Sequence, residues 1–237
     1  NVVQPDSFYI KVSTGCIYYC AYCAVKNSRG SVVSKSIAAI TTEFMQGLED
    51  GHKVFSLIGT DLGSYGRDID EDLTTLLKKL IAIEGNFTIK LRNVHPKLLI
   101  EKNAEIIELA QSGKINHITT AIQHGNDRIL HLMNRPYSIQ DCKQAIKNIK
   151  SNCPKIKIRT QMVVGFPSET EEEYHDSLNL LDEVPLDFVE VYPFSPRIGT
   201  AAMDLPDHLP RKVISKLHYI MAKKVVNMLK SQELVQG

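Results

Sequence analysis

The sequence predicts an α/β fold, an open partial (β/α)6 TIM-like barrel. Short runs rich in β-branched residues alternate with longer segments of helical periodicity, and this unit occurs six times. Such alternation is typical of βα units around a parallel sheet. The 237 residues suffice for one large domain with a substantial core. We expect the barrel to span residues 8–205 and a C-terminal helical extension to span residues 206–237.

The expected strands are short and the helices between them are amphipathic. The strands lie at residues 8–13, 53–59, 87–93, 117–123, 157–164 and 187–194, and the helices at 36–49, 69–83, 96–112, 138–151, 170–183 and 210–229. Ser168 or Thr170 can cap the fifth helix, whose first turn is rich in glutamate. Gly51, Gly85 and Gly113 each follow a helix, where a left-handed residue favours glycine.

Three cysteines follow the first strand. Cys16, Cys20 and Cys23 have the spacing C-x3-C-x2-C, and thiolates this close in sequence predict a metal or iron–sulfur site with one coordination position left open. The loop lies at the C-terminal end of a strand, where barrels of this kind carry their chemistry. Two alternatives stay open. The spacing fits one face of a helix with buried cysteines, and a distant His95 or His124 would complete a structural zinc site.

The cysteine loop resembles that of the radical S-adenosylmethionine (SAM) superfamily, because Tyr22 supplies an aromatic residue before the last cysteine. The resemblance implies a barrel of the radical SAM type. It also implies that the three cysteines are both catalytic residues and ligands of a 4Fe–4S cluster, whose fourth iron binds the amino and carboxylate groups of SAM. A reductant such as flavodoxin or ferredoxin would then be a partner. Arg29-Gly30 and Val33-Ser34, further along, resemble the methylthiotransferase subfamily.

Residues after the next strands extend the implied SAM site. Gly59, Thr60 and Asp61 begin a glycine-rich loop that lacks the lysine of a phosphate-binding loop. The resemblance places this loop near the SAM amino group, and an ordinary βα turn is the alternative. Gln123 and Arg135 belong to a run that resembles the family's Q-x-G-x-D-x-x-L-x-x-M-x-R. The resemblance implies that the arginine holds the SAM carboxylate, for which a guanidinium is well suited, and a surface arginine is the alternative.

The fifth and sixth strands and the third strand supply the last candidates. Gly165 and Glu169 belong to a segment that resembles G-F-P-G-E-T, which borders the SAM adenine, although Ser168 replaces a glycine. A positive φ at this serine would cost about 1 kcal/mol. His95 and Arg197 are candidates for substrate contact. His95 can equally cap a helix, and the Arg197 loop can equally serve packing.

The composition of the chain indicates little about its binding partners. The net charge of +1 gives no overall field that favours nucleic acid. Lysines gather at residues 143–159 and 211–230, which we interpret as solvated helix faces, with an RNA footprint as the alternative. Cys142 and Cys153 are expected to serve packing or lie at the surface, and no disulfide framework is predicted. With no membrane span or signal pattern, we expect a cytoplasmic protein without a membrane partner.

The predicted function is methylthiolation of a tRNA adenosine. The wording of residues 59–69, GTDLGSYGRDI, resembles methylthiotransferases that act on threonylcarbamoyladenosine in tRNA. A ribosomal protein aspartate is the alternative substrate. Full methylthiotransferases of the family carry an N-terminal domain with a second cluster and a C-terminal TRAM domain, neither of which this sequence contains. We therefore expect a catalytic fragment, or else a single-cluster radical SAM enzyme acting on a small molecule or peptide. A zinc-stapled binding module is the alternative that is not an enzyme.

Overall fold

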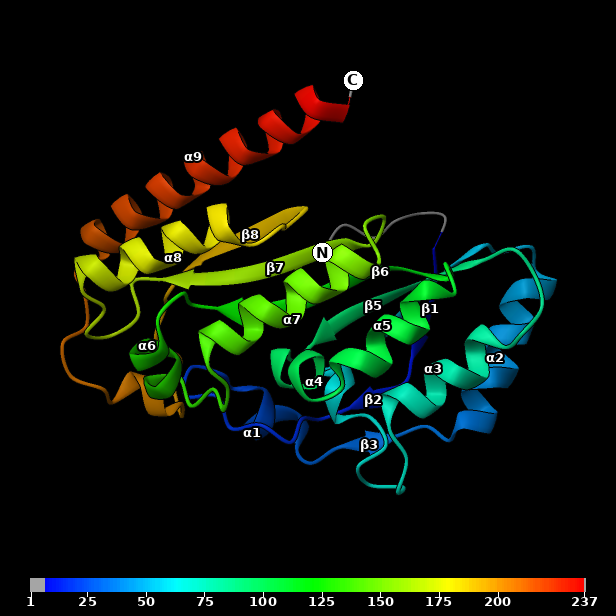
Figure 1. Ribbon diagram of the computed structural model, residues 1–237. Helices are drawn as coiled ribbons and strands as arrows, with labels where there is room; N and C mark the ends of the chain where they lie inside the picture. The colour runs from blue at the N-terminus through cyan, green and yellow to red at the C-terminus, as the bar shows by residue number, and fades with distance from the viewer. Residues whose placement is uncertain (1–6, 237) are drawn as a thin grey trace.

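Six parallel strands form the main sheet of the protein. The computed structural model describes residues 7–236, and the side chains of residues 7–231. The strands pair in the order β1 (Ser7–Lys11), β4 (Val54–Ile58), β5 (Thr88–Val94), β6 (Ile115–Gln123), β7 (Lys157–Val164) and β8 (Phe188–Pro193). Helices cover one side of this sheet, and its two edge strands do not pair with each other (Figure 1). The predicted open partial barrel is therefore confirmed.

The helices follow the strands as expected, with two corrections. They are α1 (Val25–Arg29), α2 (Ile37–Glu49), α3 (Leu73–Ile81), α4 (Pro96–Glu101), α5 (Asn103–Gln111), α6 (Asp127–Leu132), α7 (Ile139–Asn152), α8 (Glu171–Glu183) and α9 (Arg211–Gln236). The prediction that a helix begins at Ile69 is wrong, because residues 66–72 form a turn and the Asp72 side chain caps α3 by accepting from Thr75 N–H. The predicted helix at 96–112 is broken at Lys102, whose φ of −112° and ψ of 26° are not helical.

The first predicted strand also divides. After Lys11 the chain leaves the main sheet, and β2 (Ser13–Thr14) pairs antiparallel with β3 (Val33–Ser34). This small hairpin brackets the cysteine loop and α1 between its two strands. The segment that carries the cysteines is therefore closed at its base by backbone pairing, which limits where the thiols can lie.

The core lies between the sheet and the helices. Phe44 of α2 stacks on Phe55 of β4 with ring centroids 4.0 Å apart, and Phe87 meets Phe44 edge-on at 5.0 Å. Each such side chain contributes about 1.5–3 kcal/mol through burial. Side chains alternate along each strand, so that Ile89 and Leu91 face this core. The intervening positions face the other, concave side of the sheet, which is much more polar.

Several smaller predictions are also confirmed. Gly51, Gly85 and Gly113 have φ values of 86°, 128° and 73° just beyond helix ends. Cys142 and Cys153 are buried in the core and lie outside the site. In the part of the chain that the structure describes, no helix is long and apolar enough to cross a membrane.

Candidate active site

The three cysteines lie in an irregular loop between β2 and α1, so the interpretation of one helix face is wrong. Gly15 begins the loop with φ of 75°, and a Cβ atom there would lie 2.0 Å from the carbonyl oxygen of Ser31. The far side of the loop is held by Ala21, whose N–H donates to Met133 O at 2.9 Å and whose carbonyl accepts from Ala202 N–H at 2.8 Å. The loop is therefore clamped between its own hairpin and the ends of later elements.

All three thiols line a single cavity of about 320 Å³ at the C-terminal ends of the strands. The same cavity is lined by Tyr22, Thr60, Asp61, His95, Gln123 and Arg135, all of which the sequence predicted as site residues. Gly59 lies just outside, where its carbonyl accepts from the Asn93 amide at 3.2 Å. The structure thus brings together residues that are up to 119 positions apart in the sequence, from Cys16 to Arg135.

Arg135 is buried against the cysteine loop, which rules out the surface alternative. Its Nη1 lies 3.5 Å from Cys20 Sγ and 3.4 Å from Tyr22 Oη, and its Nε donates to Tyr137 Oη at 3.0 Å. Nη2 donates to the carbonyl of Ala121 at the end of β6. A fixed guanidinium at this position can bind a carboxylate that enters the cavity.

The Cys16 thiol is held by the glycine-rich loop. Ser64 Oγ lies 3.9 Å from Cys16 Sγ, and Ser64 in turn donates to Asp61 Oδ2 at 2.6 Å. Burial raises the pKa of the Cys16 thiol, so the free protein keeps it protonated. Metal binding reverses this preference, because a metal ligand must be the thiolate.

Asp61 is a structural hub at the edge of the cavity. Its Oδ1 accepts from Gly63 N–H at 3.0 Å and from His95 N–H at 2.9 Å, while Oδ2 accepts from Ser64. Asp61 is only 5% exposed, and this burial raises the pKa of its carboxyl group. Asp61 therefore links the ends of β4 and β5 to the cysteine loop.

His95 caps a helix and also lines the thiol cavity. Its Nδ1 accepts from Lys97 N–H at 3.2 Å and so caps α4, which fixes the proton of the neutral ring on Nε2. The ring stacks on Tyr18 with centroids 3.7 Å apart, and Nε2 is buried without a partner in the described residues. Burial, followed by the charge of Arg135, lowers the pKa of His95 to about 2, so the ring stays neutral.

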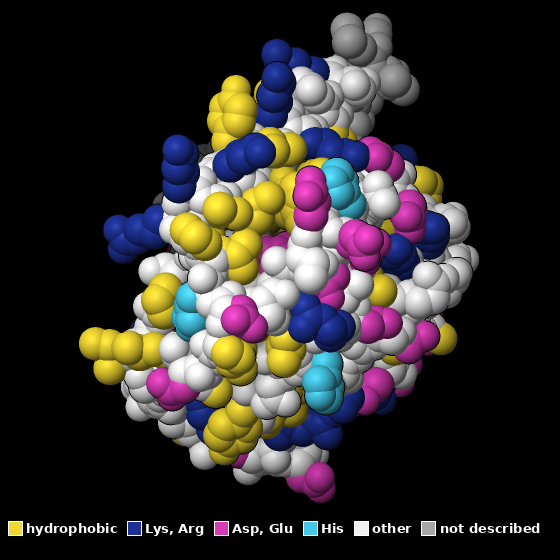
Figure 2. Space-filling model, turned by 90° about the vertical axis from the view of Figure 1, so that its left-hand side faces the viewer, with side chains coloured by type: hydrophobic (Ala, Val, Ile, Leu, Met, Phe, Trp, Pro, Cys, Tyr) yellow, Lys and Arg dark blue, Asp and Glu magenta, His cyan; other side chains and the backbone are white. Residues whose placement is uncertain are grey.

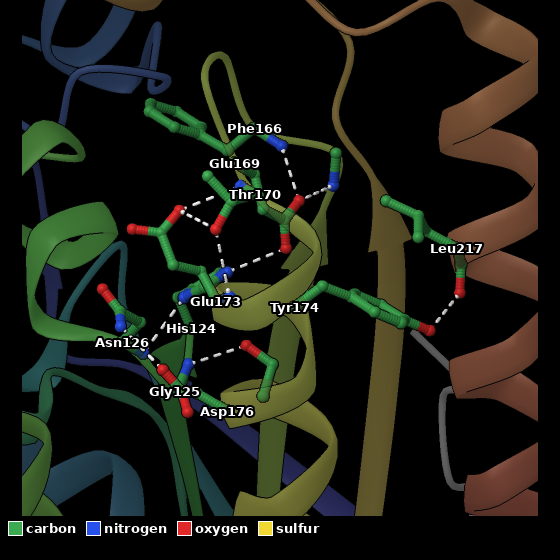
Figure 3. Close-up of polar contacts among 12 residues, drawn as sticks. His124, Gly125, Asn126, Phe166, Glu169, Thr170, Glu173, Tyr174, Asp176 and Leu217 are labelled. Carbon is green, nitrogen blue, oxygen red and sulfur yellow. Dashed lines mark hydrogen bonds and ion pairs between the residues drawn. The ribbon is translucent and has the colours of Figure 1, made fainter.

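Glu169 lies behind the cavity and acts on the loop backbone. Figure 3 shows its carboxylate pointing at His124 on one side and at the Phe166 segment on the other. Oε1 lies 2.9 Å from His124 Nε2, and Oε2 accepts from the N–H groups of Phe166, at 3.2 Å, and Gly165. The Glu169 side chain is fully buried. It holds the backbone of the Gly165 loop in place and does not face the thiol cavity.

The neighbouring residues of this loop follow the same logic. Thr170, and not Ser168, caps α8 in a capping box with Glu173. Ser168 has φ of 61°, so the serine does occupy the strained conformation for which glycine is suited. Gly165 also has a positive φ, and a Cβ there would lie 2.6 Å from the Ile214 side chain of α9.

A second cavity of about 300 Å³ adjoins the first and is lined by Arg197. Tyr22, Gln123 and Gln161 line both cavities, so the two are neighbours. Figure 2 looks onto this end of the molecule, where hydrophobic, acidic and histidine side chains are interspersed and Lys and Arg gather in the upper part, around α9. Gln123, the last residue of β6, has a strained φ of 75°, and the chain changes direction there as it enters the site.

Sequence reasoning missed several contributors, among them Tyr18, Ser64, Lys26 and Tyr137. Lys26 Nζ donates to the carbonyl of Cys16 at 2.8 Å, and Tyr137 Oη donates to Ile122 O at 2.7 Å. The position of Tyr18 between two cysteines was the available signal. Ser64 and Tyr137 act through long-range packing, which no local pattern encodes.

The thiol set fits a cluster with an open coordination position. Three thiols line one cavity, with a buried guanidinium beside them to offset thiolate charge. Among residues 7–231, no three His, Cys, Asp or Glu side chains already have the geometry of a metal site. His124 cannot complete a zinc site, because Nε2 faces Glu169 and Nδ1 accepts from Asn126 N–H at 3.1 Å.

Comparisons with known proteins agree with this geometry. The Radical SAM superfamily profile matches residues 10–181, and the chain belongs to the radical SAM superfamily, whose enzymes use a 4Fe–4S cluster and SAM. The zinc-stapled binding module is therefore ruled out. Among solved structures, the radical SAM methyltransferase TsrM from Kitasatospora setae superposes with a TM-score of 0.68 at 15% identity, over 82% of this chain and 35% of that chain. This likeness supports the fold.

Within the superfamily, the curated relatives that this chain resembles are methylthiotransferases. It is 35% identical to the ribosomal protein uS12 methylthiotransferase RimO of Desulfotalea psychrophila, over 86% of this chain and 46% of the relative. It is 35% identical to a tRNA-2-methylthio-N(6)-dimethylallyladenosine synthase of Thermoanaerobacter sp., over 85% and 43%. It is 32% identical to the threonylcarbamoyladenosine tRNA methylthiotransferase MtaB of Aquifex aeolicus, over 96% and 55%. The chain spans about half the length of these relatives.

Proposed function

We propose that residues 1–237 form the catalytic domain of a methylthiotransferase that modifies a tRNA adenosine. The observation that carries this proposal is the convergence of Cys16, Cys20 and Cys23 on one cavity beside the buried Arg135. Cys16, Cys20 and Cys23 would hold the 4Fe–4S cluster, which would supply the electron for reductive cleavage of SAM and so allow radical abstraction of hydrogen from an unreactive C–H bond. A reductant such as flavodoxin or ferredoxin would deliver that electron.

The residues of the chain have separate tasks in this proposal. The three thiols hold the cluster, and Arg135 offers its guanidinium to the SAM carboxylate. Thr60 and Asp61 lie at the wall where the SAM amino group is expected, and the Gly165 loop borders the adenine. The protein's share of such chemistry is binding, orientation and exclusion of water.

The choice of substrate needs support beyond the residues 59–69. Gly66 N–H donates to Ser34 Oγ at 2.9 Å, and Ser34 N–H donates to Asp68 Oδ2 at 2.8 Å. The GRDI segment thus braces the β2–β3 hairpin, which explains its residues without reference to a substrate. Support for tRNA comes instead from the two tRNA-modifying relatives and from the charge of the concave face, which is considered below. Methylthiolation of a ribosomal protein aspartate is the second candidate, favoured by the likeness to RimO.

A single pair of variants tests the catalytic assignment. The chain is reconstituted anaerobically with iron and sulfide, reduced with dithionite and given SAM, and 5′-deoxyadenosine is measured by mass spectrometry. We expect Cys20→Ala to abolish its formation, while Cys142→Ala, in the hydrophobic core, retains it. Formation of 5′-deoxyadenosine by folded Cys20→Ala at the wild-type rate would refute the proposal. Methylthiolation of ribosomal protein but not of tRNA by the reconstituted enzyme would refute the choice of substrate.

A further inference from the structure

A third cavity, of about 630 Å³, opens on the concave side of the sheet next to the thiol cavity. It is formed by the ends of β1, β4 and β5 together with β2 and α1. Its charged lining residues are Lys11, Arg29 and Arg92, and no Asp or Glu lines it. The thiol cavity, by contrast, is lined by the two cations Lys26 and Arg135 and the anion Asp61. All charged side chains that line the third cavity are therefore positive, unlike those of the thiol cavity.

These three cations carry no partner within the part of the chain whose side chains are described. No carboxylate among residues 7–231 forms an ion pair with any of them. The basic stretch at 143–159 differs in this respect. Its cations are largely neutralised, through the pairs Lys143–Glu183, Lys150–Asp187, Lys157–Asp187 and Arg159–Glu190. The alternative of an RNA footprint on that stretch is thus less favoured than the cavity.

Two further observations indicate that the cavity is prepared for an anion. Ser13 Oγ is buried at its wall and has no hydrogen-bond partner within the described residues. His117, also on the concave side, has its pKa lowered to about 4 by burial and then by the charges of Arg92, Lys90 and Arg159. Arg92, which lines the third cavity, is thus one of the charges that disfavour a further cation at His117.

The third cavity adjoins the thiol cavity, because Val25, Thr60 and Asn93 line both. We propose that Lys11, Arg29 and Arg92 form a phosphate subsite, which binds the backbone of an RNA substrate whose target nucleotide enters the thiol cavity. Three cations without a carboxylate suit consecutive phosphates, whereas a protein side chain would bring a single carboxylate. This inference rests on the proposed function and deepens it, since it names the residues that bind the phosphates of the substrate.

The expected effect follows from the release of counterions. For single-stranded nucleic acid, log K falls with log[salt] by about 0.7 per phosphate neutralised. Three contacts give a slope of about −2, or a loss of affinity of roughly 18-fold between 50 and 200 mM salt. Each removed cation reduces the slope by about 0.7, which leaves a loss of roughly 7-fold from two contacts.

The test uses the reconstituted 237-residue chain and a fluorescently labelled RNA stem-loop with an adenosine-containing loop. Binding is measured by anisotropy across this range of salt for wild type, Lys11→Gln and Arg92→Gln. Lys79→Gln, on the exposed outer side of α3, is the matched control. We expect both cavity variants to reduce the slope by about 0.7 and the control to keep the wild-type slope. Unfolding midpoints of all four proteins confirm that each is folded.

Three results would overturn the inference. The first is no RNA binding by the wild-type chain, and the second is cavity variants with the wild-type slope. The third is a loss of binding of an aspartate-containing peptide in Arg92→Gln with unchanged RNA binding, which would assign the cavity to a protein substrate. The proposed function is tested separately, because its failure appears as absent 5′-deoxyadenosine in the wild-type chain, whatever the slopes.

Discussion

Replacing the buried Glu169 with glutamine is expected to destabilise the protein by about 1–3 kcal/mol. The carboxylate accepts hydrogen bonds from His124 and from the backbone of the Gly165 loop, and a glutamine offers one acceptor and one donor in the same space. If the new NH₂ faces the backbone, two donors meet. If it faces His124, the ring must move its proton to Nδ1, which then loses the hydrogen bond from Asn126 N–H. One buried donor is therefore left without an acceptor in either orientation.

The measurement is urea unfolding followed by circular dichroism, with Glu172→Gln as the control. Glu172 lies in the first turn of α8 but is exposed, so its substitution is expected to cost no more than about 0.5 kcal/mol. The predicted loss of unfolding free energy for Glu169→Gln is a substantial fraction of the roughly 5–15 kcal/mol that is typical of a folded protein. A second readout is the KM for SAM in 5′-deoxyadenosine formation, which should rise because the Gly165 loop borders the proposed adenine site. Equal stabilities of the two variants and an unchanged KM would refute the reasoning.

Two further predictions concern backbone strain and acid stability. Gly15→Ala is expected to prevent iron incorporation and to destabilise by well over 1 kcal/mol, because its Cβ would meet Ser31 O, whereas Gly30→Ala, with φ of 69° and open space around it, should cost only about 1 kcal/mol. Equal unfolding free energies in urea would contradict this. Hydrogen bonds from Arg128 lower the pKa of Glu173 to about 2, so its contribution to stability is complete above pH 4.5 and is lost as the pH falls toward 2. Glu173→Gln should be less stable than wild type by about 1 kcal/mol at pH 7, and the difference should shrink toward pH 2; a constant difference would argue against this role.

The sequence predicted the fold well where local patterns agree with the tertiary structure. The strands were recognised because β-branched runs and helical periodicity alternate regularly, and their ends were correct to within about two residues. The errors fell where a side-chain cap or a turn interrupts a periodic segment. Asp72 caps α3, which begins four residues beyond the expected start, and Lys102 breaks a segment that is continuously helical in composition. Periodicity continues across such points, so it cannot locate them.

The sequence predicted which residues make up the site, but it did not predict what each side chain contacts. The cysteine spacing indicates a metal ligand set from local sequence alone, and the residues after each strand converge because parallel strands end at one edge. The direction of each side chain is a different matter. Glu169 turns inward to His124, and His95 faces both its helix and the cavity, and these orientations depend on partners 45 residues away or in a neighbouring loop.

Each end of the cysteine loop depends on a different strand, and this arrangement couples the cluster to the barrel. After β4, Asp61 accepts a hydrogen bond from Ser64, whose hydroxyl contacts the Cys16 thiol. After β6, Arg135 contacts the Cys20 thiol. Asp61 also accepts from His95 after β5, so three strand ends must be in register before the thiols share one cavity. Because a ligand that binds only the folded state stabilises that state, cluster binding should protect the β4, β5 and β6 ends more than the outer helices. A loop cut from the barrel has none of these supports, and its three thiols would lack the fixed guanidinium of Arg135 beside them.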